Sequence, residues 1–117
     1  MLPKTVFAAA ALLLWAGPAL AAQPIEGNWK TLKGDTARIA PCGDSFCITL
    51  MDGKYAGKQI GILKGQGGLY TGQVTDPEAD KTYEGSATVT GNALKLQGCV
   101  MKIFCKSQVW TREQAPG

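Results

Sequence analysis

The residues of this chain best suited to covalent chemistry are its four cysteines, at positions 42, 47, 99 and 105. Four cysteines allow three disulfide pairings, and spacing alone does not separate them. Each close pair flanks a predicted turn, and opposed positions of a hairpin bring Cα atoms to about 4.5–5.5 Å, which suits a disulfide. We therefore favour Cys42–Cys47 and Cys99–Cys105, with the cross pairings left open. The chain has no histidine, and gaps of four and five residues do not fit a zinc site, so we expect no metal.

Trp29 and Arg112 form a second pair with chemical potential, because they stand near the two ends of the strand-rich region. If the first and last strands meet, the guanidinium can stack on the indole face. The structural interpretation is a plug that fixes the ends of a barrel. The functional interpretation is that Arg112 holds a carboxylate of a ligand through a bidentate contact.

Carboxylates gather at Asp76, Glu78 and Asp80. Alternating carboxylates can bind calcium, but the glycine and the glutamate that complete a calcium loop are missing here. We interpret the segment as a solvated turn in which Asp76 accepts hydrogen bonds from its own backbone.

Hydrolysis by paired carboxylates would need two acids on facing strands, and Glu84 with Asp76 is the candidate pair. The absence of histidine removes the usual general base, and the cysteines are expected to be oxidised. The sequence therefore favours a protein that is not an enzyme and needs no cofactor, with a carboxylate-dependent hydrolase as the alternative.

Basic and aromatic side chains alternate at Lys54, Tyr55, Lys58 and Lys64, near Tyr70, in the style of a platform for single-stranded nucleic acid. The formal net charge is only +3, and one of the basic residues, Lys4, falls in the predicted leader. So weak a charge argues against nucleic acid as a partner. We interpret these lysines as a solvent-facing surface.

Residues 1–21 have the pattern of a secretory signal peptide: Lys4, an uncharged apolar run from Val6 to Trp15, then Pro18 and the small-residue site Ala19-Leu20-Ala21. We expect cleavage after Ala21 and a single domain over residues 22–117. The apolar run is shorter than the roughly 20 residues of a membrane-spanning helix. We therefore expect no stable membrane insertion after cleavage, and a periplasmic or extracellular location.

The rest of the chain alternates apolar and polar residues in short segments separated by glycine. This period of two predicts strands, and no window beyond the leader has helical periodicity. The predicted strands are 29–32, 36–41, 45–51, 58–64, 69–75, 81–90, 93–98 and 103–112. About eight short strands joined by tight turns predict an all-β fold, a small antiparallel up-and-down barrel, with a sandwich or an oligonucleotide-binding type of barrel as alternatives.

The inward faces of these strands should hold the apolar bulk, and Ile62 and Val109 are placed among them. Small residues on the same faces, Ala87 and several glycines, either let the barrel collapse or leave room for a guest. Tyr83 shares its face with Ala87, so both join Trp29 and Arg112 as candidate ligand-binding residues. We expect a mostly filled interior with at most a shallow apolar pocket at one mouth.

The segment Gly27-Asn28-Trp29, together with an arginine on the closing strand, resembles the calycin signature of lipocalins and fatty-acid-binding proteins. The resemblance implies a lipocalin-like barrel in which Trp29 packs against Arg112. The second lipocalin motif is absent, since Thr75-Asp76 is followed by Pro77-Glu78-Ala79.

A wider set of landmarks resembles DUF2147, a family of small exported bacterial proteins to which no catalytic residues are assigned. The landmarks are Gly27-Asn28-Trp29, Cys42 with Cys47, Asp76-Pro77, Lys81-Thr82-Tyr83-Glu84-Gly85, Leu94-Lys95-Leu96-Gln97-Gly98-Cys99, Cys105, Ser107-Gln108 and Trp110-Thr111-Arg112. This resemblance implies a small lipocalin-like barrel in the periplasm or outside the cell.

Two functions from different classes fit the sequence. The first is an exported, non-enzymatic barrel that binds a small apolar or amphipathic, lipid-like ligand. The second is a structural or protein-interaction module of the cell envelope with a filled core.

Overall fold

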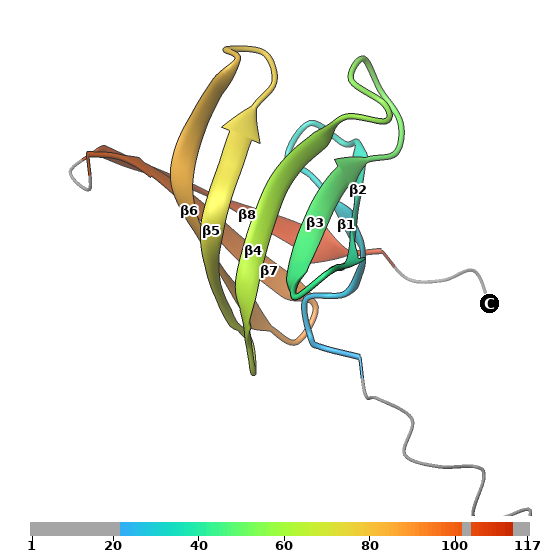
Figure 1. Ribbon diagram of the computed structural model, residues 1–117. Coiled ribbons are helices and arrows are strands. Elements are labelled where there is room, and N and C mark those ends of the chain that lie inside the picture. Colours follow the sequence, from blue (N-terminus) through green and yellow to red (C-terminus); the bar gives the residue numbers. More distant parts are fainter. Residues whose placement is uncertain (1–21, 102–103, 114–117) are drawn as a thin grey trace, which may run out of the picture.

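A computed structural model describes residues 22–101 and 104–113; the predicted signal peptide, residues 1–21, lies outside them. Eight antiparallel strands follow one another around a closed barrel (Figure 1). They are β1 (Gly27–Lys30), β2 (Thr36–Cys42), β3 (Ser45–Leu50), β4 (Gln59–Gln66), β5 (Leu69–Asp76), β6 (Lys81–Thr90), β7 (Ala93–Val100) and β8 (Phe104–Arg112). The predicted all-β, up-and-down barrel of about eight strands is confirmed.

The strands form where apolar and polar residues alternate, because successive side chains of a strand point to opposite faces. On β3, Ile48 and Leu50 are buried with Phe46 packed against the same core. The turns fall where the backbone can adopt a positive φ. Gly43 between β2 and β3 has a φ of 70°, and Gly91 between β6 and β7 has a φ of 59°, a conformation that costs glycine little.

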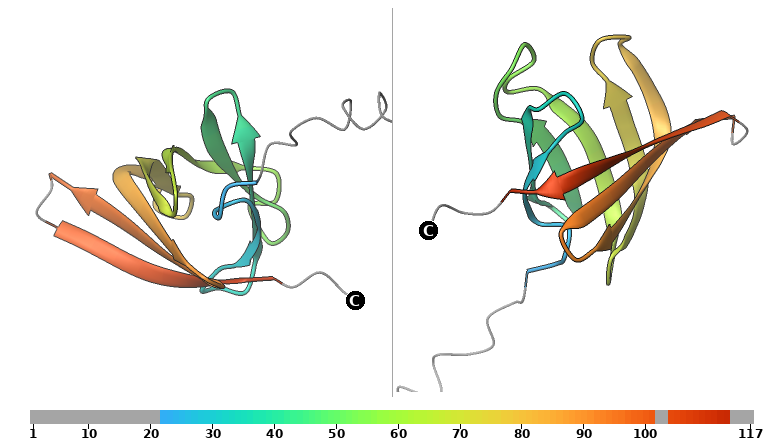
Figure 2. Two further views of the ribbon diagram at one scale, coloured as in Figure 1. Left: turned by 90° about the horizontal axis from the view of Figure 1, so that it is seen from below. Right: turned by 180° about the vertical axis from the view of Figure 1, so that it is seen from behind.

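The seam between β1 and β8 closes the barrel through only two residue pairs, Trp29 with Arg112 and Lys30 with Thr111. By contrast, β7 and β8 pair over eight positions, from Ala93 with Thr111 to Val100 with Phe104. Within the described residues, β8 from Phe104 to Trp110 therefore pairs with β7 alone. Figure 2 shows the consequence: the β7–β8 hairpin extends away from the rest of the barrel at its tip.

The core fills the end of the barrel opposite this tip. Trp29 is fully buried, and its indole Nε1 donates to the carbonyl of Ile25, 2.9 Å away. The segment before β1 covers this end, since the side-chain oxygen of Gln23 accepts hydrogen bonds from the Tyr70 hydroxyl at 3.2 Å and the Gly67 amide at 3.1 Å. The N-terminal segment therefore belongs to the core as much as the strands do.

Two residues predicted to face inward point outward instead: Ile62 is 41% exposed and Val109 is 53% exposed. On β4, Ile48 of β3 pairs with Gly61 while Thr49 pairs with Gln59, so Ile60 is an extra residue in the ladder. Such a bulge reverses the alternation beyond it. Ile60 and Leu63 are buried as a result, and Ile62 is not.

The small inward residues do not all make room for a guest. Gly72, Gly85 and Gly98 are register partners on three adjacent strands. A methyl group on Gly72 would overlap the carbonyl oxygen of Ile62, and one on Gly85 would lie 2.8 Å from a methyl of Val74. The first two glycines are therefore already covered by their neighbours. They allow β5 and β6 to pack closely against their neighbours at these positions.

Candidate functional site

The barrel has two unlike ends. At the closed end lie the segment Gln23–Glu26 and the turns that follow β2, β4 and β6. At the other end, which we call the mouth, lie the β1–β2, β3–β4 and β5–β6 loops and the tip of the β7–β8 hairpin. The candidate site is a cavity that opens at the mouth.

Trp29 and Arg112 meet at the closed end, as the calycin-like closure implies. The guanidinium carbon of Arg112 lies 4.3 Å from the centre of the Trp29 ring. Its Nη1 donates to the carbonyl of Glu26 at 3.0 Å, and its Nη2 donates to the carbonyl of Pro24 at 2.7 Å. These contacts tie the last strand to the N-terminal segment. Neither Trp29 nor Arg112 lines the cavity.

Glu113 reinforces the same seam on the outside of the barrel. Its carboxylate pairs with Lys30 of β1 at 2.8 Å and accepts from the hydroxyl of Thr36 of β2 at 3.1 Å. The hydrogen bond from Lys30, followed by that from Thr36, holds the pKa of the Glu113 carboxyl below its usual value. The same hydrogen bond raises the pKa of Lys30.

The cavity has a volume of about 570 Å³ and a mainly apolar wall. Six strands contribute apolar side chains to it, and residues of the four mouth segments form its rim. The lining apolar residues on strands are Leu50, Ile60, Val74, Tyr83, Leu96, Val100, Phe104 and Trp110. A cavity of this size and polarity is within the range of small-molecule sites. The interior is thus filled around Trp29 and hollow toward the mouth.

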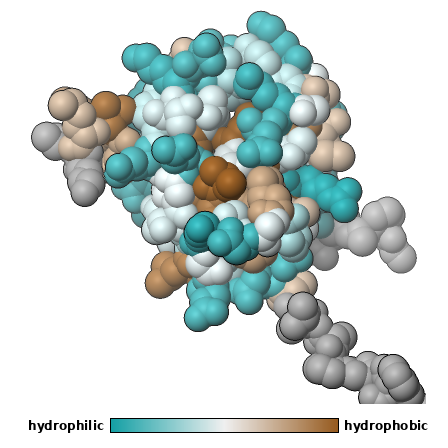
Figure 3. Space-filling model, viewed as in Figure 1, coloured by the Kyte–Doolittle hydropathy of each residue, from teal (hydrophilic) through white to brown (hydrophobic). Residues whose placement is uncertain are grey.

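The rim is partly apolar and exposed. Leu32 is 68% exposed and Phe104 is 75% exposed, and both line the cavity. Figure 3 shows the apolar patch at the tip of the β7–β8 hairpin, where Val100 and Met101 are also exposed. Exposed apolar side chains beside an apolar cavity extend the surface on which a ligand or a partner could rest.

Charged side chains of the rim loops are largely engaged with their neighbours. Lys33 of the β1–β2 loop forms an ion pair with Glu78 of the β5–β6 loop. Asp76 accepts hydrogen bonds from the backbone amides of Glu78 at 3.0 Å and Ala79 at 3.4 Å, which is the turn role predicted for it. Lys54 lies 5.4 Å from the centre of the Tyr55 ring.

On the inner face of β8, Lys106, Gln108 and Trp110 line the cavity. The side-chain oxygen of Gln108 accepts a hydrogen bond from the indole Nε1 of Trp110 at 2.6 Å. Trp110 is buried, with 2% of its surface exposed. These three residues were not among the ligand-binding residues predicted from the sequence. The sequence could have indicated them. If Arg112 faces Trp29, then residues 106, 108 and 110 lie on the same inward face of β8 as Arg112, because alternate residues of a strand share a face.

The predicted ligand-binding residues therefore do not form one site. Tyr83 lines the cavity, whereas Ala87 is fully buried in the core and takes no part in the lining. Trp29 and Arg112 belong to the closed end. The two carboxylates considered for hydrolysis also differ, since Asp76 lies at the rim and Glu84 is not among the lining residues.

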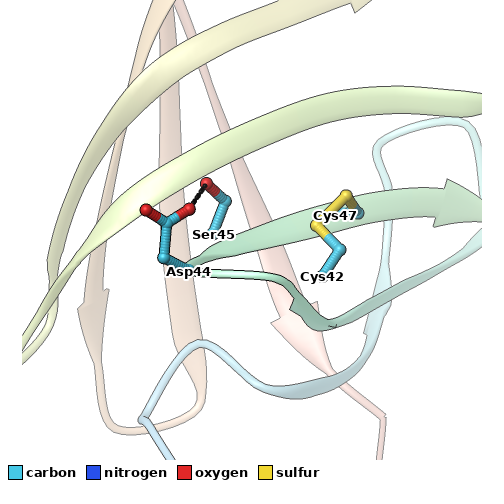
Figure 4. Close-up of a disulfide and its surroundings, with 4 residues drawn as sticks. All are labelled: Cys42, Asp44, Ser45 and Cys47. Carbon is cyan, nitrogen blue, oxygen red and sulfur yellow. Dashed lines mark hydrogen bonds between the residues drawn. A yellow bond between two sulfur atoms is a disulfide. The ribbon is translucent and has the colours of Figure 1, made fainter.

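Both favoured disulfides are present. Cys42 and Cys47 are bonded across the β2–β3 turn with a Cα–Cα distance of 5.8 Å, close to Asp44 and Ser45 (Figure 4). The Ser45 hydroxyl donates to Asp44 at 3.3 Å, and Lys64 lies 3.3 Å from the same carboxylate, which lowers the pKa of Asp44. Cys99 and Cys105 are bonded near the hairpin tip. Two disulfides suit a non-reducing environment.

Over residues 22–101 and 104–113, no cluster of three or more His, Cys, Asp or Glu side chains could hold a metal ion. Within the same ranges there is no helix with the length and apolar character needed to cross a membrane.

Comparison with known proteins gives one match. No curated protein and no solved structure matches the chain. A family model described as "Uncharacterized protein conserved in bacteria (DUF2147)" matches residues 57–112, a stretch that contains β4 to β8 and most of the cavity wall. The resemblance stated from the sequence is thereby confirmed over residues 57–112, where the chain matches the DUF2147 family of bacterial proteins.

Proposed function

We propose that this protein is a non-enzymatic binding protein whose mouth cavity takes a small apolar or amphipathic ligand. The observation that carries the proposal is the cavity of about 570 Å³, open at the mouth and walled mainly by apolar side chains of six strands. Exposed apolar surface of this kind is costly in water, and filling it with a ligand removes that cost.

The distribution of polar groups supports binding over catalysis. The carboxylates of the rim are committed to structure, Glu78 to its ion pair with Lys33 and Asp76 to its turn. A general acid or base needs a pKa tuned toward neutrality and a position beside the substrate. The carboxyls whose pKa is shifted, Asp44 and Glu113, are shifted downward by lysines outside the cavity.

Export to the periplasm or to the cell exterior is part of the proposal. Two observations support it: the leader-like pattern of residues 1–21 and the pairing of all four cysteines as disulfides. In this view the ligand is met outside the cytoplasm, where a small barrel stapled by disulfides keeps its shape.

Native mass spectrometry of the protein, purified without detergent from its bacterial host, tests the proposal. A ligand carried from the cell should appear as an adduct that gentle activation releases. A Leu96→Trp variant should lose the adduct because the indole would fill the cavity that Leu96 lines. The matched control is Leu69→Trp, because Leu69 is 67% exposed and outside the lining.

Two results would count against ligand binding. One is a bare protein that also fails to take up added amphiphiles. The other is an adduct that the Leu96 and Leu69 variants retain equally.

A second candidate is protein interaction, without the filled core that the sequence suggested. It is favoured by the edge of β8, which from Phe104 to Trp110 pairs only with β7 in the described part of the chain. Such an edge can accept an extended strand from a partner protein. Lys106 on that strand discourages pairing, which places this candidate second. A partner strand should be lost on Val109→Lys while amphiphile uptake persists, because Val109 is exposed on β8 and lies outside the lining.

A further inference from the structure

Lys106 stands apart from the other charged groups of the cavity. It is the one cation that a strand places on the cavity wall in the described residues, whereas Lys33 and Lys54 stand on rim loops. Its register partner across β7–β8 is Gly98, which also lines the cavity and has no side chain to cover the ammonium group.

The acids of the mouth leave Lys106 without a partner. No carboxylate of residues 22–101 or 104–113 lies within ion-pair distance of its Nζ. Glu78 is paired with Lys33, and Asp76 is held by its own turn. The carboxylate of Asp35 lies against Gly53 of the β3–β4 loop, within 2.8 Å of where a Cβ of that glycine would stand. The ammonium group is therefore available to an anion from outside.

Gln108 adds a second donor on the same face. Its side-chain oxygen is engaged by the Trp110 indole, so the amide nitrogen is the end left to face the cavity. Residues two apart on a strand lie about 6.6–6.8 Å from one another and point the same way. Lys106 and Gln108 thus present donors to one group rich in oxygen atoms.

We propose that the ligand of this cavity is an amphiphile with an aliphatic tail and an anionic head, a carboxylate or a phosphate. The Nζ of Lys106 and the amide nitrogen of Gln108 hold the head on the β8 wall. The tail lies against the apolar walls formed by Leu50, Ile60, Val74 and Leu96. This inference rests on the proposed function and adds the chemical class of the ligand.

Calorimetric titration with amphiphiles of one tail length tests the assignment: decanoate, decyl phosphate, decanol and decyltrimethylammonium, with inorganic phosphate alone as a fifth probe. Decanoate or decyl phosphate should bind about fivefold more tightly than decanol, the upper end of the gain expected of one exposed ion pair. Decyltrimethylammonium and inorganic phosphate should bind most weakly. The stronger of the two anions identifies the head as carboxylate or phosphate.

Lys106→Gln should reduce the affinity for the anions about fivefold and leave that for decanol unchanged. Lys95→Gln is the matched control, because Lys95 is an exposed lysine of neighbouring β7 outside the lining. Equal affinity for all four amphiphiles, or equal effects of Lys106→Gln and Lys95→Gln, would overturn the assignment of an anionic head group and leave the proposed function standing. Binding of inorganic phosphate as tight as that of decyl phosphate overturns the role of the tail. Failure of every amphiphile to bind overturns both proposals.

Discussion

Replacing Arg112 by alanine is the most direct test of how the barrel closes. The guanidinium stacks on Trp29 at 4.3 Å and donates to the carbonyls of Glu26 and Pro24. Stacking of a cation on an indole contributes about 0.5–2 kcal/mol, depending on exposure. Each hydrogen bond from the half-buried guanidinium adds about 1 kcal/mol. The variant should therefore lose about 2–4 kcal/mol of its free energy of unfolding.

Because the β1–β8 seam has only two paired positions, the contacts of Glu113 with Lys30 and Thr36 compensate for only part of this loss. For a domain of this size, each kcal/mol corresponds to about 4–8 °C in Tm, so the expected decrease is at least about 8 °C. Arg112→Lys should recover only part of it, because an ammonium group lacks the planar fork that reaches two carbonyls while stacking.

Urea denaturation and a thermal melt followed by tryptophan fluorescence would measure the effect. The matched control is Arg38→Ala on β2, an exposed arginine that should change stability by less than about 0.5 kcal/mol. If Arg112→Ala and Arg38→Ala were equally mild, the reasoning that assigns barrel closure to Arg112 would be refuted.

Three further predictions follow from the core, the disulfides and the seam. Ala87→Leu should destabilise the fold by about 1–3 kcal/mol through overpacking, since Ala87 is fully buried, whereas Ala93→Leu at an exposed site of β7 should be neutral in urea denaturation. Peptide mapping without reductant should recover Cys42 bonded to Cys47 and Cys99 bonded to Cys105, and a peptide that joins the two pairs would contradict the fold. In urea denaturation, the double variant Cys42→Ser and Cys47→Ser should lose about 2–3 kcal/mol of its free energy of unfolding. The pKa of Glu113 is lowered in the folded protein, so its contribution is present above the unfolded value of about 4.3 and is lost as pH falls through the folded value. Near neutral pH, the Glu113→Gln variant should accordingly have a lower Tm than the unchanged protein, and its Tm should fall less below about pH 4. If the Tm values of the two proteins ran parallel over the pH series, the ion pair would be contradicted.

Much of the fold could be predicted from the sequence because each strand is a local pattern. Alternation placed all eight strands to within a few residues, and glycines marked the turns. Even the contact between Trp29 and Arg112, far apart in sequence, was predictable, since a meander that closes must join its first and last strands.

Ile62 and Val109 were wrongly predicted to face inward for one physical reason: the sequence does not show at which residue the alternation of inward and outward side chains is set or shifted. Alternation along β4 fails after Ile60, because a bulge inserts an extra residue that no local pattern announces. On β8 the prediction contradicted itself: Arg112 facing Trp29 and Val109 facing the core cannot both hold on one regular strand. The closing contact is the stronger constraint, and it turns Val109 to solvent.

The candidate site was harder to predict than the fold, because the cavity depends on where β8 leaves β1. That separation follows from the shortness of β1, which ends at Lys30 and pairs with β8 at two positions only. Beyond them, the inner face of β8 no longer meets a neighbouring strand on that side, and Lys106 can line a cavity instead of a core.

One strand thus serves two ends of the barrel with the same face. Arg112 and Trp110 close and fill one end, while Gln108 and Lys106 line the mouth. Because a slip of one residue would turn all four side chains to the other face, the register fixed at the seam also fixes the donors of the candidate site. The stacking of Arg112 on Trp29 therefore stabilises the seam on the same face of β8 that turns Lys106 toward the cavity, while eight pairs with β7 hold the register between the two ends.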